Sequence, residues 1–227
     1  MAKPAIYWIR NDLRLSDNRA LAAALEDDRA VLPVYIREDN GNGPLGAAQA
    51  WWLERSLEKL ASRYDELGAP LVLRSGDPLN VLRALIEESE AEAVFWNRRY
   101  STEGIRADKA VKAALGEDGI TVRSFAGQIL HEPSNFKTKS GGPYKVYTPF
   151  WKAFSADQHV PDPVDAPKRL EGIAKKIKSE KLKDWKLYEA RPDWAAGFSD
   201  IWQPGEEGAI ERLEHFVEDV VQDYAEK

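Results

Sequence analysis

Two polar stretches hold the side chains of this sequence that are best suited to chemistry. The first runs from Arg10 to Asp17 and contains two arginines and two aspartates. The second runs from Asn97 to Glu103 and brings together an amide, two guanidiniums, a phenol and a carboxylate. A guanidinium binds a carboxylate or a phosphate through two parallel hydrogen bonds, so these groups suit the recognition of an anionic or amide-bearing ligand. Paired with one another, the same groups would only brace their own loops by ion pairs.

Each polar stretch directly follows an apolar segment that predicts a buried strand. Helical periodicity fills the intervals between such segments, which predicts four right-handed β–helix–β crossovers. The expected fold is α/β, with a five-stranded, doubly wound parallel sheet of the Rossmann-like type. The five predicted strands lie at residues 5–9, 31–36, 71–74, 93–96 and 122–125.

The two polar stretches are expected to meet at one edge of this sheet. The strands at residues 5–9 and 93–96 carry the polar loops, and a doubly wound sheet makes them neighbours at its switch point. Ligands bind at such a point, beyond the carboxyl ends of the strands. The topology therefore predicts one crevice that Arg10 and Asp12 share with residues 97–103.

Local signals place several helix ends. Asp17 is the predicted N-cap of the first helix, and Asp77, which a proline follows, is the predicted N-cap of the third. Gly68 is expected to end the long second helix. Trp51 and Trp52 are adjacent on that helix and point about 100° apart, so they cannot both face the same core element.

A glycine-rich run resembles a dinucleotide-binding turn but lacks its context. Residues 41–46 spell G-x-G-x-x-G after a predicted strand and before a predicted helix. The first glycine lies several residues past the strand, and Pro44 has no amide to donate to a phosphate. No acid ends the following strand at the expected distance of ~20 residues. We therefore predict a plain loop there.

The composition argues against several classes of protein. The 227 residues include no cysteine, which rules out disulfides and thiolate metal sites and fits the reducing cytoplasm. His131, His159 and His215 lie far apart in the sequence, so no metal site is expected. No apolar run reaches the length of about eighteen residues that a membrane span needs. The net charge of −6 argues against strong nucleic-acid binding by this chain alone.

The sequence changes character after His131. Residues 137–151 mix turn formers with aromatic side chains, and this aromatic content predicts that they lie against a surface. An amphipathic helix is expected from Glu206 onward, with apolar residues at helical spacing through to Tyr224. The predicted units are an α/β domain at 1–130, a linker at 131–205 and the first helix of a further, helical domain at 206–227.

Three motifs in chain order resemble those of the DNA photolyase and cryptochrome family. The run WIRNDLRLSDN at residues 8–18 is similar to the family's opening W-F-R-x-D-L-R-L-x-D-N. Trp96 and Asn97 with Tyr100 match a second motif, and PYKVYTPFW at residues 143–151 matches a third. The chain looks most like bacterial photolyases that repair cyclobutane pyrimidine dimers, in the branch near plant cryptochromes.

The resemblance implies the N-terminal part of a light-driven repair enzyme, a deoxyribodipyrimidine photo-lyase. Full-length members join an α/β antenna-binding domain through a long linker to a helical domain that holds FAD and UV-damaged DNA. Residues 206–227 then represent the start of a truncated FAD-binding domain. We expect this chain alone to contain no catalytic residue, to be inactive, and to be a monomer whose partner is its own helical domain.

The resemblance also implies the cofactor contacts. Methenyltetrahydrofolate is the expected antenna, because folate-binding relatives hold the pterin with an acid after the strand end, where Glu103 is the nearest carboxylate here. Deazaflavin is less expected, because Arg106 stands at about the position where deazaflavin-binding relatives use an aspartate. Glu38 is a second carboxylate candidate, and Tyr224 matches a family position that contacts the FAD phosphate. The remaining antenna candidates are neighbours that could pair or stack with the pterin: Arg10, Asn97, Arg98, Arg99 and Tyr100.

Two other functions stay open at this point. A cryptochrome-type blue-light sensor would share this half of the sequence, because the residues that contact a lesion are expected in the other half. An unrelated adenine-nucleotide-binding domain would have the same fold, since a fold alone does not settle function. That domain would need a phosphate-cradling glycine loop after the fourth strand, where the sequence has none.

Overall fold

The computed structural model describes residues 3–38, 45–133, 136–156, 161–188 and 192–224. The glycine-rich run at residues 41–46 therefore lies mostly outside the described residues. The strands are β1 (Ala5–Ile9), β2 (Val31–Glu38), β3 (Val72–Gly76), β4 (Ala93–Asn97) and β5 (Thr121–Phe125). The helices of the sheet domain are α1 (Arg19–Ala24), α2 (Ala47–Leu67), α3 (Pro78–Ser89) and α4 (Thr102–Glu117), with a short 3₁₀ turn η1 (Glu26–Asp28) after α1. Further along come α5 (Tyr147–Ala156), η2 (Leu182–Trp185), α6 (Phe198–Ile201) and α7 (Glu206–His215), which continues as η3 (Phe216–Val220) and η4 (Val221–Asp223).

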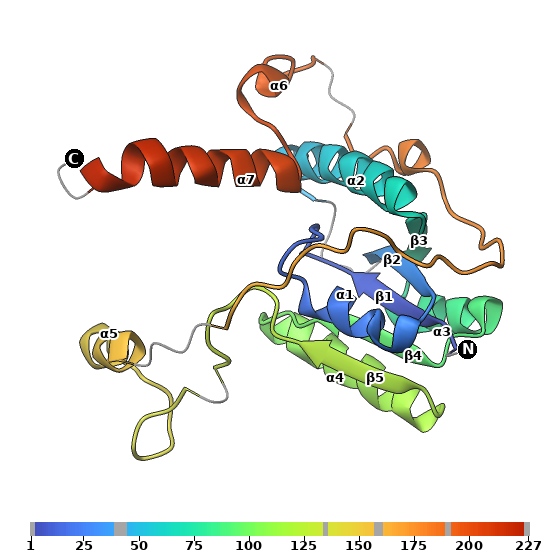
Figure 1. Ribbon diagram of the computed structural model, residues 1–227, viewed down its shortest axis with the longest axis horizontal. Coiled ribbons are helices and arrows are strands. Elements are labelled where there is room, and N and C mark those ends of the chain that lie inside the picture. The colour runs from blue at the N-terminus through green and yellow to red at the C-terminus, as the bar shows by residue number, and fades with distance from the viewer. Residues whose placement is uncertain (1–2, 39–44, 134–135, 157–160, 189–191, 225–227) are drawn as a thin grey trace.

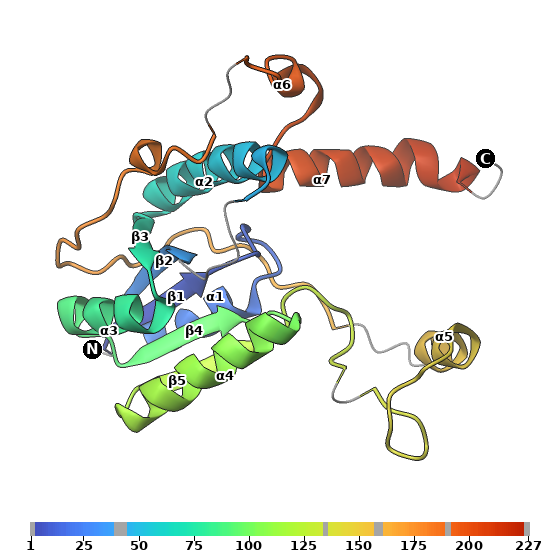
Figure 2. The ribbon, with the colours of Figure 1, turned by 180° about the vertical axis from the view of Figure 1, so that it is seen from behind.

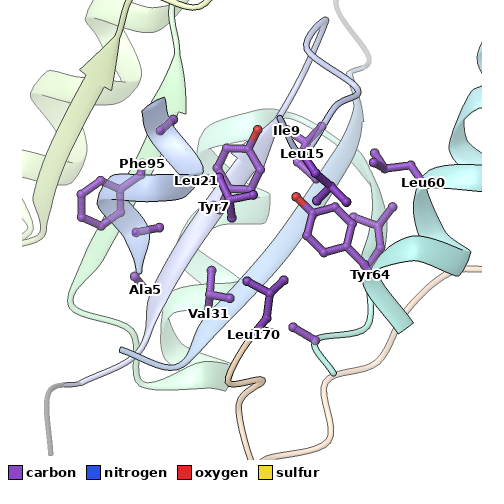
Figure 3. Close-up of a cluster of buried hydrophobic side chains, with 14 of the residues drawn as sticks. Ala5, Tyr7, Ile9, Leu15, Leu21, Val31, Leu60, Tyr64, Phe95 and Leu170 are labelled. Carbon is purple, nitrogen blue, oxygen red and sulfur yellow. The ribbon is translucent and has the colours of Figure 1, made fainter. Parts of the chain in front are cut away.

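The five strands form one parallel sheet in the order β3-β2-β1-β4-β5 (Figure 1). This order confirms the predicted doubly wound fold and places β1 beside β4 at the switch point. Helices cover both faces, and alternate residues of each strand point to opposite sides. Tyr7 and Phe95 pack with α1 and α2 on one face, where Figure 3 shows Tyr7 and Tyr64 among the aliphatic side chains. Trp8 and Trp96 pack with α3 and α4 on the other.

Most of the predicted helix ends are confirmed. Asp77 accepts a hydrogen bond from the amide of Asn80, and Gly68 ends α2 in the left-handed conformation, with φ of 96°. The prediction of Asp17 as the first N-cap is wrong. The helix begins one residue later than expected, so Asn18 is the N-cap and accepts from the amide of Leu21.

The two adjacent tryptophans of α2 do point different ways, as the helix period predicts. Trp51 is buried, and its ring meets Phe198 of α6 edge to face, with 5.3 Å between the ring centroids. Trp52 is 42% exposed and contacts the ring of Trp202. Both rings therefore help to hold the segment around α6 over α2.

The segment that follows α5 runs along the sheet domain and completes its core. Leu170 and Trp185 are buried in the cluster on the α1 and α2 face. The amide of Val31 donates to the carbonyl of Glu171 at 2.7 Å, and Val31 forms an isolated bridge with Gly172. β2 begins three residues before its first pair with β3, so its free edge is available to this segment.

The aromatic segment around α5 differs from the expectation. Phe136, Tyr144, Phe150 and Phe154 pack on one another, with centroid separations of 5.3 to 6.1 Å. Figures 1 and 2 both show α5 standing away from the sheet, and Trp151 on it is 52% exposed. These aromatics therefore build a small cluster of their own instead of covering the domain.

α7 also projects from the body of the molecule (Figure 2). Leu213 of α7 and Val217 of the following η3 are 60% and 53% exposed. Within the described part of the chain, no helix combines the length and the apolar character of a membrane span. The same residues hold no group of three or more acids and histidines that could bind a metal ion.

Candidate functional site

The carboxyl ends of β1 and β4 carry two hydrogen-bonded networks, one on each face of the sheet. This is the edge at which the sequence predicted a shared crevice, and Arg10, Asp12 and Asn97 do meet there. All three side chains are buried. The networks are joined because the guanidinium of Arg10 donates to the main-chain carbonyl of Asn97, while its amide donates to Asp12 at 3.1 Å.

The first network lies on the α1 face and centres on the carboxylate of Asp12. Tyr7 donates its hydroxyl hydrogen to Asp12 Oδ2 at 2.9 Å, and Asn97 Nδ2 donates to the same oxygen at 2.5 Å. Asn97 also donates to Asn18 Oδ1 at 2.9 Å. Burial raises the pKa of Tyr7 well above its ordinary value, and the nearby carboxylate adds to the effect. Tyr7 therefore stays a neutral donor, and this network works as a brace.

The second network lies on the α4 face and centres on a buried ion pair. Arg10 binds Asp108 through both terminal nitrogens, at 2.6 and 2.9 Å. The guanidinium carbon lies 4.4 Å from the centroid of the Trp8 ring and 5.6 Å from that of Trp96, close enough for cation–π attraction. The two indoles meet edge to face, with 5.4 Å between their centroids.

Arg99 extends this network outward to the end of β2. Its guanidinium donates to Glu38 at 2.6 Å and more weakly to Asp108 at 3.4 Å. The side chains of Arg99 and Glu38 are 16% and 14% exposed, so this pair lies slightly nearer to solvent than the Arg10–Asp108 pair, whose side chains are 3% and 11% exposed. Burial, reinforced by the Glu38 carboxylate, raises the pKa of Tyr35 to about 12.

Asp108 is the residue of this site that sequence reasoning missed. It lies two turns into α4, on the same stripe as the buried Gly104, Val111 and Leu115. An acid at a core-facing position of an amphipathic helix is the signal that could have found it, because a buried carboxylate needs a cationic partner. The sequence does not say which of the several nearby arginines that partner is.

Two other predicted site residues are held by a carboxylate beyond β5. Arg98 binds Glu132 at 2.8 Å, and the hydroxyl of Tyr100 donates to the same oxygen at 3.1 Å. Partial burial and the Glu132 carboxylate together raise the pKa of Tyr100, although Arg98 opposes them. These two side chains therefore bind Glu132 rather than the carboxylates of the two networks.

The structure does not bring Glu103 or Tyr224 into either network. Glu103 is exposed on the first turn of α4 and has no hydrogen bond or ion pair with any other described residue. A carboxylate at that place is favoured by the helix dipole alone. Tyr224 is 70% exposed at the far end of the helix that α7 begins, where its ring contacts Phe216.

Two glycines, one in α4 and one after β5, let the chain pack tightly at this edge. A Cβ atom on Gly127 would lie 2.5 Å from the Cβ of Asn97, and one on Gly104 would lie 2.6 Å from the Cβ of Arg99. Real side chains do not approach so closely, so both positions require glycine. The site is therefore preformed by packing as well as by ion pairs.

The site also has unused hydrogen-bonding groups. Among the described residues, Asn97 Oδ1, Arg99 Nε and the indole nitrogens of Trp8 and Trp96 are buried without a partner. The chemistry of the pair at the rim suits a flat heterocycle with an amino-pyrimidine edge. One oxygen of Glu38 accepts from Arg99 and the other could accept from a ligand N–H, while the guanidinium of Arg99 offers a face for stacking.

Comparison with known proteins identifies relatives along the whole chain. Residues 5–168 match the model of the DNA photolyase family. A deoxyribodipyrimidine photo-lyase from Agrobacterium fabrum is 54% identical over 98% of this chain and 46% of its own length. Cryptochrome-2 of Arabidopsis thaliana is 31% identical over 99% of this chain and 38% of its own length. The chain thus spans less than half the length of these curated relatives.

A solved structure is similar over the full chain. The bacterial class III photolyase from Agrobacterium tumefaciens superposes with a TM-score of 0.95 at 53% sequence identity. The match covers 100% of this chain and 47% of that one. The extended segments after β5, including α5 and α7, are therefore part of the shared architecture.

Proposed function

We propose, from the premise that this chain belongs to the DNA photolyase family, that it is the light-harvesting N-terminal part of a deoxyribodipyrimidine photo-lyase. In this proposal the complete protein repairs UV-damaged DNA with FAD, which the helical domain holds. The part described here binds the antenna chromophore. The 54% identity along nearly the whole chain supports a photolyase over a cryptochrome.

The Glu38–Arg99 pair carries the proposal of an antenna site. It lies at the carboxyl edge of the sheet, beside the switch point where ligands of this fold bind. We propose methenyltetrahydrofolate as the ligand, with Glu38 pairing its amino-pyrimidine edge and Arg99 against its ring. When bound, this group absorbs light and passes the excitation to the flavin.

The other predicted contacts take different parts in this proposal. Arg10 and Asn97 hold the site in shape, because they are more deeply buried than Glu38 and Arg99 and bind Asp108 and Asp12. Glu103 remains a candidate at the rim of the same edge. Arg98 and Tyr100 are candidates for the outer wall of the antenna site. Tyr224 is a candidate for one contact with the FAD phosphate, and the described residues supply no other candidate for the flavin.

Titration of methenyltetrahydrofolate into the purified chain, followed by near-ultraviolet absorbance, tests the antenna proposal. Glu38→Gln removes a charge-assisted hydrogen bond and should weaken binding by ~1.5–3 kcal/mol, or roughly ten- to hundredfold. Glu117→Gln, at the exposed far end of α4, is the matched control and should bind like the parent. Parental affinity in Glu38→Gln with weakened binding in Glu103→Gln would move the site to Glu103. Parental affinity in both would refute a carboxylate-held pterin at this edge.

The repair activity is proposed for the complete protein only. We propose that this chain alone neither holds FAD nor splits dimers, because a single phosphate contact from Tyr224 cannot offset the cost of ordering the cofactor. Irradiating the chain with reduced FAD and a thymine-dimer oligonucleotide under blue light should therefore give no repair. Dimer splitting in that mixture would refute the assignment of FAD binding and repair to the helical domain.

Two broader expectations complete the proposal. We also expect the chain to be a monomer. The absence of cysteine in 227 residues supports work in the reducing cytoplasm. The family match leaves no room for an unrelated adenine-nucleotide-binding domain.

A further inference from the structure

The loop between β1 and α1 is a junction for several distant parts of the chain. Arg14 donates to the carbonyl of Gly127 beyond β5 at 2.6 Å. The amide of Asp17 donates to the carbonyl of Val164 in the segment after α5 at 2.6 Å. Asn18, at the end of the loop, accepts from Asn97 of β4. The conformation of this loop therefore depends on three other segments.

A fourth contact reaches the same loop from α7. The carboxylate of Glu206, the first residue of α7, accepts from the amides of Leu15 and Ser16, each at 2.7 Å. It also accepts from the hydroxyl of Ser16. Two successive amides donate to the two oxygens of one carboxylate, which favours a negative charge at this place. Charge-assisted hydrogen bonds of this kind are about twice as strong as neutral ones.

The start of α7 is shaped to aim Glu206 at the loop. Gly205 has φ of 100°, which a side chain would disfavour, and a Cβ atom there would lie 3.1 Å from Lys59 of α2. A Cβ atom on Gly208 would lie 2.2 Å from the carbonyl oxygen of Gln203. The chain therefore turns tightly against α2 before the helix begins, and Glu206 emerges from a closely packed base.

Beyond its base, the described part of α7 makes only weak charged contact with the domain. Glu207, the next residue, makes one exposed contact with Arg63 at 3.6 Å, which is worth little in water. Farther along, Leu213 and Val217 are exposed, and the helix projects from the body in both ribbon views (Figures 1 and 2). The direction of α7 is therefore set at its base.

We propose that Glu206 is a positioning residue that latches α7 to the β1–α1 loop, so that the helix and the carboxyl edge of the sheet keep one fixed relative geometry. The loop it grips lies between Asp12 and Asn18, the two side chains that brace the α1 face of the candidate site. The value of this coupling for light harvesting rests on the proposed function, because energy transfer depends on the relative position and orientation of two chromophores. The latch itself is a property of this chain.

Amide hydrogen exchange tests the latch directly. In Glu206→Gln, exchange at the amides of Leu15 and Ser16 should become at least tenfold faster than in the parent. The amide of Ala5, which donates to Ala30 at the start of β1, should keep its parental rate. A merely structural role would speed all three amides together. Parental rates at Leu15 and Ser16, or an equal rise at Ala5, would overturn the proposal.

Distance measurements between spin labels test the geometry. The chain has no cysteine, so Asp65→Cys on α2 and Glu218→Cys beyond α7 provide two exposed labelling sites. The parent background should give one narrow distance distribution, and Glu206→Gln should broaden or shift it. Glu207→Gln is the matched control and should leave it narrow. An unchanged distribution in Glu206→Gln would overturn the proposal. Neither measurement uses folate or flavin, so a failed folate titration with an intact latch would refute the proposed function alone.

Discussion

Removing Asp108 should destabilise the domain more than removing any exposed acid. The Arg10 side chain is 3% exposed and that of Asp108 is 11% exposed, so solvent screens their ion pair weakly. Asp108→Asn keeps the shape but leaves the charge of Arg10 buried without a full counter-charge. Losing one partner of a buried pair costs about 3–5 kcal/mol, and asparagine can still accept one hydrogen bond, so we expect about 3 kcal/mol. For a domain of this size that corresponds to a fall in Tm of about 6–12 °C.

Urea unfolding followed by circular dichroism measures this loss. The midpoint should fall while the slope stays unchanged, because the surface exposed on unfolding is the same. Asp118→Asn is the matched control, since the Arg83–Asp118 pair is also bidentate but has side chains 46% and 39% exposed. That variant should lose at most ~1 kcal/mol. Equal losses in the two variants would refute the claim that burial makes the Arg10–Asp108 pair essential.

A double variant separates the charge from the packing. Arg10→Met combined with Asp108→Leu removes both charges and fills similar space, which in other buried pairs restores most or all of the stability. We expect the double variant to be more stable than Asp108→Asn. A double variant that is less stable would show that the other contacts of the Arg10 guanidinium, with the Trp8 ring at 4.4 Å and with the carbonyl of Asn97, contribute more than its pairing with Asp108.

Two further perturbations test the packing around the sheet. Slight burial raises the pKa of the Glu180 carboxyl. Hydrogen bonds, of which the one from the Trp185 indole has the largest effect, lower it further than burial raises it, so this pKa lies below its usual value. Because the pKa is lower in the folded state, this stabilisation is present above pH ~4.5 and is lost as the pH falls through the lowered value. In urea unfolding, the difference in stability between the parent and Glu180→Gln should therefore shrink between pH 7 and pH 3. Gly127→Ala should cost about 1–3 kcal/mol in the same assay, because its Cβ atom would lie 2.5 Å from that of Asn97. Gly116→Ala on α4, where a Cβ atom would meet nothing within 4 Å, should instead gain up to ~1 kcal/mol, and a similar effect at both glycines would contradict the steric explanation.

The sequence by itself determined the elements and their order. The ends of each predicted strand lie within two residues of the observed ends. A buried strand is an apolar run between polar turns, and this pattern can be recognised from neighbouring residues alone. The same is true of the helix stops, where one residue such as Gly68 decides the end. The adjacency of β1 and β4 also followed, since right-handed crossovers leave few topologies for five parallel strands. The predicted N-cap of α1 was one residue too early. Asp17 and Asn18 are both favourable N-cap residues, and the sequence does not show that the helix begins at Arg19.

Only the tertiary structure decided which charged groups meet. Arg10 and Asp108 are 98 positions apart, and Leu15 and Glu206 are 191 apart, so no local pattern records either contact. Several arginines and acids lie near the carboxyl edge, and all of them suit an ion pair equally well by residue type. Their partners follow from which face of the sheet each strand end points to and from where α4 and α7 pack. Secondary structure is set by short-range periodicity and local backbone preferences, whereas the pairing of distant side chains depends on how those elements are packed in space.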